Sequence, residues 1–293
     1  MKKFLIILSL LIGSMSAMAQ DNNTFFQLPV IPDSLQNLQD RTDFMVTHYW
    51  DFCDLNKAFS SRDKMAEAFD TYLSFMPYAS ATVVYAGVDN FMKKIAKKPA
   101  NVLFIGELAE NKLYSDSAEI QSDELFLRFA QAIVDNGKVD KASKMRYRHL
   151  VEVLSGSQPG QIARPFSYTD LYGTQGTFAV DTTKICTVLF FNDPDCSDCN
   201  MARIRLDADV KTRMLVEGGK VDIVSIYASD PDQNWTEQAM NYPKEWLTVA
   251  SEQVNDLYDM RHTPTFYILN PNGAILARTP NVTDIIAVMS HLK

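Results

Sequence analysis

Two cysteines three positions apart are the residues of this chain with the clearest capacity for chemistry. The motif Cys196-Ser-Asp-Cys199 follows a nearly unbroken apolar run, Ile185–Phe191, and precedes a segment with helical spacing. Unpaired amides and the positive dipole end at a helix N-terminus stabilise a thiolate, the reactive species in disulfide exchange. We therefore expect Cys196 to attack disulfides and Cys199, one helical turn further on, to resolve the mixed disulfide.

A zinc site and an inert structural disulfide are the alternatives for this pair. Zinc would need two further ligands, and the sequence has neither a second C-x-x-C nor a paired histidine motif. The strand-turn-helix context favours redox use over a static bridge, so we predict no metal. Cys53 and Cys186 are isolated, and a bridge between them would need a geometry that sequence cannot establish.

Three aspartates, Asp193, Asp195 and Asp198, surround the cysteine pair. Like charge disfavours a thiolate, so we expect Asp195 and Asp198 to modulate the thiols and to move the couple towards a reductant. Each exposed charge is worth ~1 kcal/mol at ~4 Å, which corresponds to some tens of millivolts for the two together. The alternative for Asp195 is that it caps the following helix.

The elements that position the motif follow residue 155, where the turn-rich segment Ser155–Gln161 marks a domain boundary. We predict strands and helices in alternation, which gives an α/β sandwich over residues 156–293. The expected strands are Pro165–Thr169, Thr177–Val180, Ile185–Phe191, Val221–Tyr227, Trp246–Ala250, Phe266–Leu269 and Ala274–Ala277. The expected helices are Met201–Leu215 (with Ile204 and Val210 on its apolar side), Asn234–Met240, Glu252–Met260 and one from Val282.

Before that boundary, apolar residues recur at helical spacing, as in the series Met65, Phe69, Leu73. Residues 20–155 are therefore predicted to form an all-α domain of helical hairpins, with Ser122 or Asp123 capping one helix. We expect its Met and aromatic side chains to be core rather than the lining of a groove.

The N-terminus has the pattern of a secretory signal peptide over residues 1–19. Lys2 and Lys3 precede the apolar run Phe4–Ile12, and small residues end at Ala19. We expect cleavage near Ala19/Gln20, export to the periplasm and no membrane embedding, because no later segment approaches the ~18 apolar residues of a spanning helix. The formal net charge of -8 argues against nucleic acid as a partner.

The second half resembles the thioredoxin superfamily and, within it, the TlpA/ResA-like periplasmic reductases. The resemblance rests on the C-x-x-C motif, on Thr263-Pro264-Thr265 and on the hairpin Asn270–Ile275. It implies that Pro264 is cis beside the cysteines and that Thr263 offers its backbone to a substrate. It also implies a thiol-disulfide oxidoreductase that reduces or isomerises client disulfides, serves cell redox homeostasis, needs no bound cofactor and takes electrons from a membrane-borne thiol donor.

The chain departs from that family around the motif. Trp-Cys-x-Pro-Cys becomes Asp195-Cys-Ser-Asp-Cys199, and Ala202 and Ile204 replace the usual glutamate and proline. No acidic residue lies in Ile185–Phe191, so the general base is not identified, and His262 is either a proton shuttle or an ordinary loop residue. A non-catalytic scaffold module and peroxide reduction by Cys196 remain alternative functions.

The helical half resembles a domain of unknown function that precedes thioredoxin domains in exported proteins of Gram-negative anaerobes. The segments Ala109–Tyr114 and Met145–His149 carry this resemblance. Our hypothesis is that this domain recruits a protein client or positions the redox domain.

Overall fold

The computed structural model describes residues 26–293, which divide into two units that meet between Arg148 and His149. This division lies inside helix α8 (Lys141–Gly156), and the predicted boundary after residue 155 lies in the same helix. The predicted signal peptide, residues 1–19, lies outside the described residues. Among residues 26–293, no helix is both long enough and apolar enough to cross a membrane.

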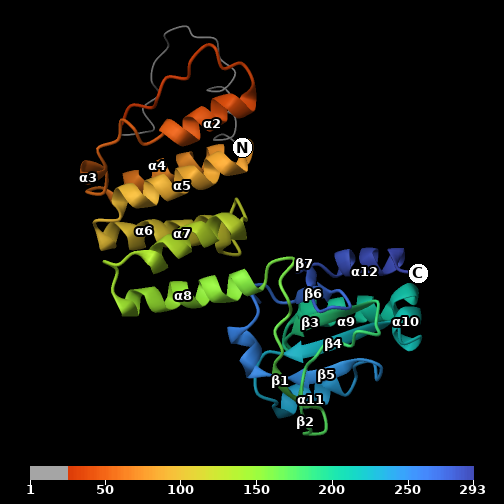
Figure 1. Ribbon diagram of the computed structural model, residues 1–293. Coiled ribbons are helices and arrows are strands. Elements are labelled where there is room, and N and C mark those ends of the chain that lie inside the picture. Colours follow the sequence, from red (N-terminus) through yellow and green to blue (C-terminus); the bar gives the residue numbers. More distant parts are fainter. Residues whose placement is uncertain (1–25) are drawn as a thin grey trace. The chain divides into compact units, whose positions relative to one another are not determined.

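The first unit is helical, which confirms the prediction from apolar periodicity. Figure 1 shows its helices running side by side as stacked hairpins. They are α2 (Leu38–His48), α3 (Leu55–Ala58), α4 (Arg62–Phe75), α5 (Ala81–Ile95), α6 (Pro99–Ala109) and α7 (Asp123–Asp135), with a 3₁₀ turn at Met76–Tyr78 and a π-helical turn at Glu110–Tyr114.

Local sequence sets the ends of these helices, and their apolar faces form the core. The predicted cap of α7 is present, because the Ser122 side chain accepts the Leu125 N–H at 3.3 Å. Met65 and Phe69 of α4 are fully buried, so these side chains are core, as we expected. Trp50 stacks on Phe91 of α5 with ring centroids 4.5 Å apart, which adds to the burial of both aromatics.

The second unit contains a mixed seven-stranded sheet in the order β2-β1-β5-β4-β3-β6-β7. Strand β3 lies near its centre, parallel to β4 and antiparallel to β6. The strands are β1 (Ser167–Asp170), β2 (Gln175–Thr177), β3 (Cys186–Asn192), β4 (Val221–Tyr227), β5 (Leu247–Ala250), β6 (Thr265–Leu269) and β7 (Ile275–Thr279). The helices are α9 (Ser197–Ala208), α10 (Val210–Glu217), α11 (Gln233–Ala239) and α12 (Val282–His291), with a 3₁₀ turn at Glu252–Asp256.

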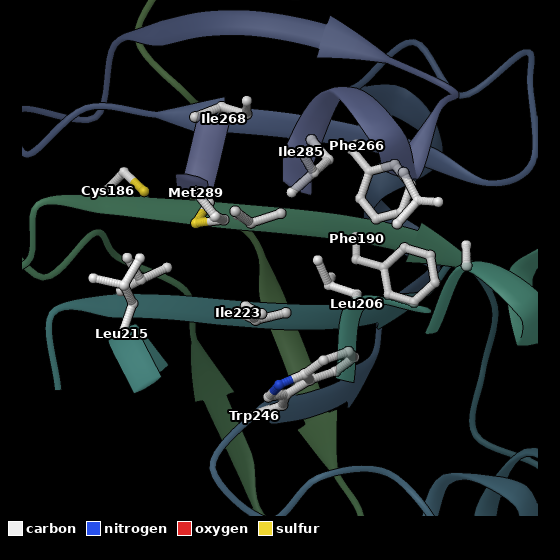
Figure 2. Close-up of a cluster of buried hydrophobic side chains, with 14 of the residues drawn as sticks. Cys186, Phe190, Leu206, Leu215, Ile223, Trp246, Phe266, Ile268, Ile285 and Met289 are labelled. Atoms are coloured by element: carbon white, nitrogen blue, oxygen red, sulfur yellow. The ribbon is translucent and has the colours of Figure 1, made fainter. Parts of the chain in front are cut away.

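Every residue of β3 is buried, as the nearly unbroken apolar run Ile185–Phe191 predicted, although Ile185 itself precedes the strand and is 37% exposed. On one face, Phe190 of β3 stacks on Phe266 of β6 with centroids 4.6 Å apart, within the cluster drawn in Figure 2. Leu206 and Met289 bring α9 and α12 into that cluster. The other face carries a second apolar cluster, which includes Leu189 and Tyr267. The sheet is thus covered on both sides, as in the predicted sandwich.

Four details of the second unit differ from the predictions. The helix expected over Met201–Leu215 begins earlier and divides in two, because the Asp209 side chain accepts the Thr212 N–H at 2.8 Å and starts a new helix. Ile204 and Val210 are exposed, since Ala202 and Leu206 form the buried face of α9, and Thr212 and Leu215 form that of α10.

The other two differences are in short elements. Strand β2 covers Gln175–Thr177 instead of Thr177–Val180, because Gln175, Gly176 and Thr177 pair with β1 across the turn at Gly173. The segment Glu252–Met260 forms only a 3₁₀ turn, Glu252–Asp256, which lies against the sheet through the buried Val254.

Candidate redox site

Helix α9 begins at the cysteine motif, directly after the turn that follows β3. Cys196 is its N-cap residue, in extended backbone conformation, and the Cys199 N–H points at Cys196 Sγ over 3.1 Å. Donation from a backbone amide to a sulfur is the interaction that favours a thiolate at a helix start. An amide in the first turn of α9 thus donates to the sulfur of Cys196.

A disulfide joins Cys196 to Cys199, with their Cα atoms 5.2 Å apart. This Cα separation lies in the ordinary range for a bridge. The two sulfurs differ in access, because Cys199 is 1% exposed whereas Cys196 is only partly buried. A disulfide partner can thus reach Cys196 more readily than Cys199.

The segment before β6 contacts the same sulfur. The Thr263–Pro264 peptide bond is cis, as the family resemblance implied, and the Thr263 carbonyl oxygen lies 3.7 Å from Cys196 Sγ. Thr263 is exposed and Pro264 is buried. β6 begins at Thr265, opposite Phe191 at the end of β3, so the register of these two strands brings Thr263 to the cysteines.

A buried carboxylate that sequence reasoning missed holds the loop before Thr263. Asp259 is 3% exposed and forms ion pairs with Arg261, at 2.6 Å, and with Arg278 of β7. Its backbone carbonyl accepts the Tyr267 hydroxyl at 2.8 Å, and its N–H donates to Ser157 Oγ at 2.9 Å. Arg278 and Ser157 lie 19 and 102 positions from Asp259, and contacts over such separations give no local sequence signal.

The aspartates near the motif are fixed by local hydrogen bonds. Asp193 Oδ1 accepts the Asp195 N–H at 2.8 Å, and Asp195 Oδ1 accepts Asn234 Nδ2 at 3.0 Å. Asp195 is not the helix cap, so that alternative is wrong, because the chain turns one residue later and Cys196 takes the capping position. Asp198 is exposed in the first turn of α9.

A buried polar cluster at the end of β3 was also missed. Asn192 is 4% exposed, and its amide donates to Phe190 O and to Ser225 Oγ, both at 2.9 Å. Its Oδ1 accepts the Tyr242 hydroxyl at 3.1 Å, and burial raises the pKa of Tyr242, so the phenol stays protonated. This cluster ties β3, β4 and the segment before β5 together beside the motif.

The two remaining cysteines are free thiols, so the bridge considered between them is not formed. Burial raises the pKa of Cys186 to about 11, and Asp222 adds to the shift. Burial likewise raises the pKa of Cys53 to about 11, with a contribution from Asp54. Among residues 26–293, no cluster of three His, Cys, Asp or Glu side chains is arranged to hold a metal ion.

A central β-strand that leads into a C-x-x-C helix, with a cis-proline beside it, defines the second unit as a thioredoxin-like fold. Residues 179–284 match the family model described as a thioredoxin-like domain, and residues 13–157 match a domain of unknown function, DUF5106. The chain thus carries a DUF5106 domain followed by a thioredoxin-like domain. The predicted fold class is confirmed.

Solved structures from Bacteroides resemble the chain. A thioredoxin-like protein from Bacteroides caccae is 22% identical, with a TM-score of 0.73 over 92% of this chain and 99% of that one. The thioredoxin domain of a thiol-disulfide oxidoreductase from Bacteroides vulgatus is 19% identical, with a TM-score of 0.40 over 45% of this chain and 96% of that one. No curated protein sequence matches the chain.

Proposed function

We propose that this chain is a thiol-disulfide oxidoreductase that reduces or isomerises protein disulfides through Cys196 and Cys199. The observation that carries the proposal is the disulfide at the start of α9, whose more accessible sulfur faces the first-turn amide of Cys199. In the reduced form, the Cys196 thiolate attacks a client disulfide and releases one client thiolate. Cys199 then attacks the mixed disulfide and releases the second, which leaves the protein oxidised.

The residues around the pair have supporting roles in this proposal. The exposed Thr263, next to the buried Pro264, offers its backbone to an extended client segment whose cysteine reacts with Cys196. Asp195 and Asp198 disfavour the thiolate and so favour the disulfide form of the protein. An electron donor in the cell would then regenerate the dithiol. A measurement of the reduction potential of the Cys196/Cys199 couple would show whether the protein acts as a reductant or as an oxidant.

The cellular setting is part of the same proposal. The N-terminal pattern of residues 1–19 supports export and cleavage near Ala19/Gln20, which would place the protein in the periplasm. There, by likeness to TlpA/ResA-like reductases, a membrane-borne thiol donor would supply electrons. The helical DUF5106 domain would recruit or orient disulfide-bearing client proteins.

Reduction of insulin by dithiothreitol tests the proposal. We expect the wild-type protein to accelerate insulin precipitation and Cys196→Ser to return the rate to that of the protein-free control. Cys53→Ser, which alters a thiol of the helical unit, is the matched control and should retain the wild-type rate. Equal acceleration by wild type and Cys196→Ser would instead favour a scaffold in which the cysteines are incidental.

A further inference from the structure

The loop that brings Thr263 to Cys196 has no regular secondary structure of its own. Residues 259–264 lie in neither a helix nor a strand, and β6 begins only at Thr265. The Thr263 carbonyl oxygen nevertheless lies 3.7 Å from Cys196 Sγ. Backbone outside helices and sheets depends on side chains or water for its hydrogen bonds. The position of this carbonyl therefore depends on the side chains that bond to the loop.

Two buried hydroxyls hold the start of this loop. Asp259 donates its N–H to Ser157 Oγ at 2.9 Å, and its carbonyl oxygen accepts the Tyr267 hydroxyl at 2.8 Å. The Ser157 and Tyr267 side chains also form a hydrogen bond with each other. Ser157 is 1% exposed and Tyr267 is fully buried. Both polar groups of the Asp259 backbone are thus bonded to side chains in the interior of the protein.

The Asp259 side chain extends this constraint towards Thr263. Its carboxylate accepts Arg261 Nε–H at 3.1 Å and the backbone N–H of Arg261 at 3.3 Å. The carbonyl of the next residue, His262, accepts the Thr265 hydroxyl. Thr263 therefore lies between two residues whose backbones are held by side chains.

The two hydroxyls come from distant parts of the second unit. Ser157 directly follows α8, the helix within which the two units meet, and it lies 102 positions before Asp259. Tyr267 belongs to β6, where it pairs with Leu189 of β3. The end of α8 and the centre of the sheet thus both bond to the Asp259 backbone, and together they determine where the loop begins.

We infer that Ser157 and Tyr267 are positioning residues, which set the Thr263 backbone for pairing with an extended client segment. The inference rests on the proposed function and specifies its substrate as a disulfide within a peptide chain, because a small disulfide without peptide groups gains nothing from this backbone. Both hydroxyls bond to Asp259 rather than to a cysteine, so they act on the pairing with the client and not on the sulfurs.

Single-turnover reduction of two uncharged disulfides tests this role. One is the disulfide-linked dimer of acetyl-Ala-Ala-Cys-Ala-Ala-amide, which has peptide groups on both sides of the cysteine. The other is hydroxyethyl disulfide, which has none. Pre-reduced, full-length protein is mixed with each, and every turnover converts the dithiol and one disulfide to the Cys196–Cys199 disulfide and two released thiols. Each rate is divided by that of dithiothreitol with the same disulfide, and the ratio of the two normalised rates is the peptide preference.

We expect wild type to prefer the peptide and Tyr267→Phe to lower this preference about fivefold, the equivalent of one hydrogen bond. Ser157→Ala should lower it by a similar factor, because it removes the acceptor of the Asp259 N–H. Tyr172→Phe and Ser155→Ala are the matched controls, since they make the same chemical changes at exposed side chains and should keep the wild-type preference.

The outcomes separate the two proposals. If wild type reduces neither disulfide, the proposed function is wrong. If wild type reduces both without preferring the peptide, the positioning role is refuted and the function stands. The role is also refuted if Tyr267→Phe and Ser157→Ala slow both disulfides by the same factor, because a loss of structure alone would do that. Tyr267→Phe removes only a hydroxyl, so it tests the role even if Ser157→Ala fails to fold.

Discussion

The two ends of β3 place cysteines in opposite environments. Cys186 opens the strand, 3% exposed, in the same apolar cluster as Leu215 and Met289 (Figure 2), and burial raises its pKa to about 11. Cys196 lies four residues beyond the other end, partly exposed, with an amide of α9 directed at its sulfur. The comparison teaches that the start of a helix, rather than the presence of a thiol, makes a cysteine suited to exchange.

The strand order explains why the reactive end is the carboxyl end. β3 and β4 are parallel and in register from Cys186 opposite Val221 to Asn192 opposite Tyr227. The loops that follow such strands meet at one edge of the sheet, which is where α/β proteins place their sites. Asn192, the C-x-x-C motif and the cis-proline segment all lie at this carboxyl end of β3. At the other end of the strand, apolar side chains pack around Cys186.

The largest effect that we expect is a loss of stability when the ion pairs of Asp259 are removed. It tests whether these ion pairs hold the loop before Thr263, at the carboxyl end of β3. Asp259→Ala removes the carboxylate that forms ion pairs with both Arg261 and Arg278. Breaking a buried ion pair costs roughly 3–5 kcal/mol. We expect a loss of about 3 kcal/mol of unfolding free energy here, because both arginine side chains are partly accessible to solvent. Urea unfolding monitored by circular dichroism measures the loss.

Asp256→Ala is the matched control for this substitution, because that carboxylate is 80% exposed and lies 3.8 Å from His149. It should change the free energy of unfolding by less than about 0.5 kcal/mol. If Asp259→Ala is as stable as the control, the loop before Thr263 does not depend on its ion pairs, and the carboxyl end is less preorganised than the structure implies.

Thiol alkylation tests the contrast between the two ends directly. A pKa of about 11 leaves ~0.01% thiolate in Cys186 at pH 7, against ~3% for an ordinary thiol of pKa ~8.5. In the reduced protein we expect iodoacetamide to modify Cys196 at least ~300-fold faster than Cys186. Peptide mass spectrometry of timed samples gives both rates.

The pH dependence of the same reaction has a defined sign. Because burial raises the pKa of Cys186, its alkylation should accelerate ~10-fold per pH unit between pH 7 and pH 10. Cys53 also has a pKa of about 11 but is less buried. A difference in alkylation rate between Cys53 and Cys186 therefore reports the accessibility of the thiol and not its ionisation, and we expect Cys53 to react faster. Equal rates for Cys186 and Cys196 at pH 7 would remove the basis of the comparison.

Sequence predicted one end of β3 better than the other elements of the site. The apolar run, the C-x-x-C spacing and Thr263-Pro264 are local patterns, and the structure brings all three together. The Asp259–Arg278 ion pair and the Asn192 cluster join residues 19 to 50 positions apart. The spacing of apolar residues along the sequence cannot reveal such contacts. Ile204 and Val210 misled the prediction because an exposed Ile or Val looks like a buried one in sequence.

The smallest effect that we expect concerns the polar cluster next to the motif. Tyr242→Phe removes the hydroxyl that donates to Asn192 Oδ1 at 3.1 Å and should cost about 1 kcal/mol of unfolding free energy at pH 7. Because burial raises the pKa of Tyr242, this contribution is complete below the unfolded value of ~10 and is lost as the pH rises through the folded pKa. Wild type and variant should therefore converge in stability above pH 10, in urea titrations at each pH. Tyr172→Phe is the control, because that side chain is 89% exposed, and its free energy of unfolding should match that of wild type at every pH. If the difference in unfolding free energy between wild type and Tyr242→Phe instead grows with pH, the Tyr242 hydroxyl accepts a hydrogen bond rather than donating one.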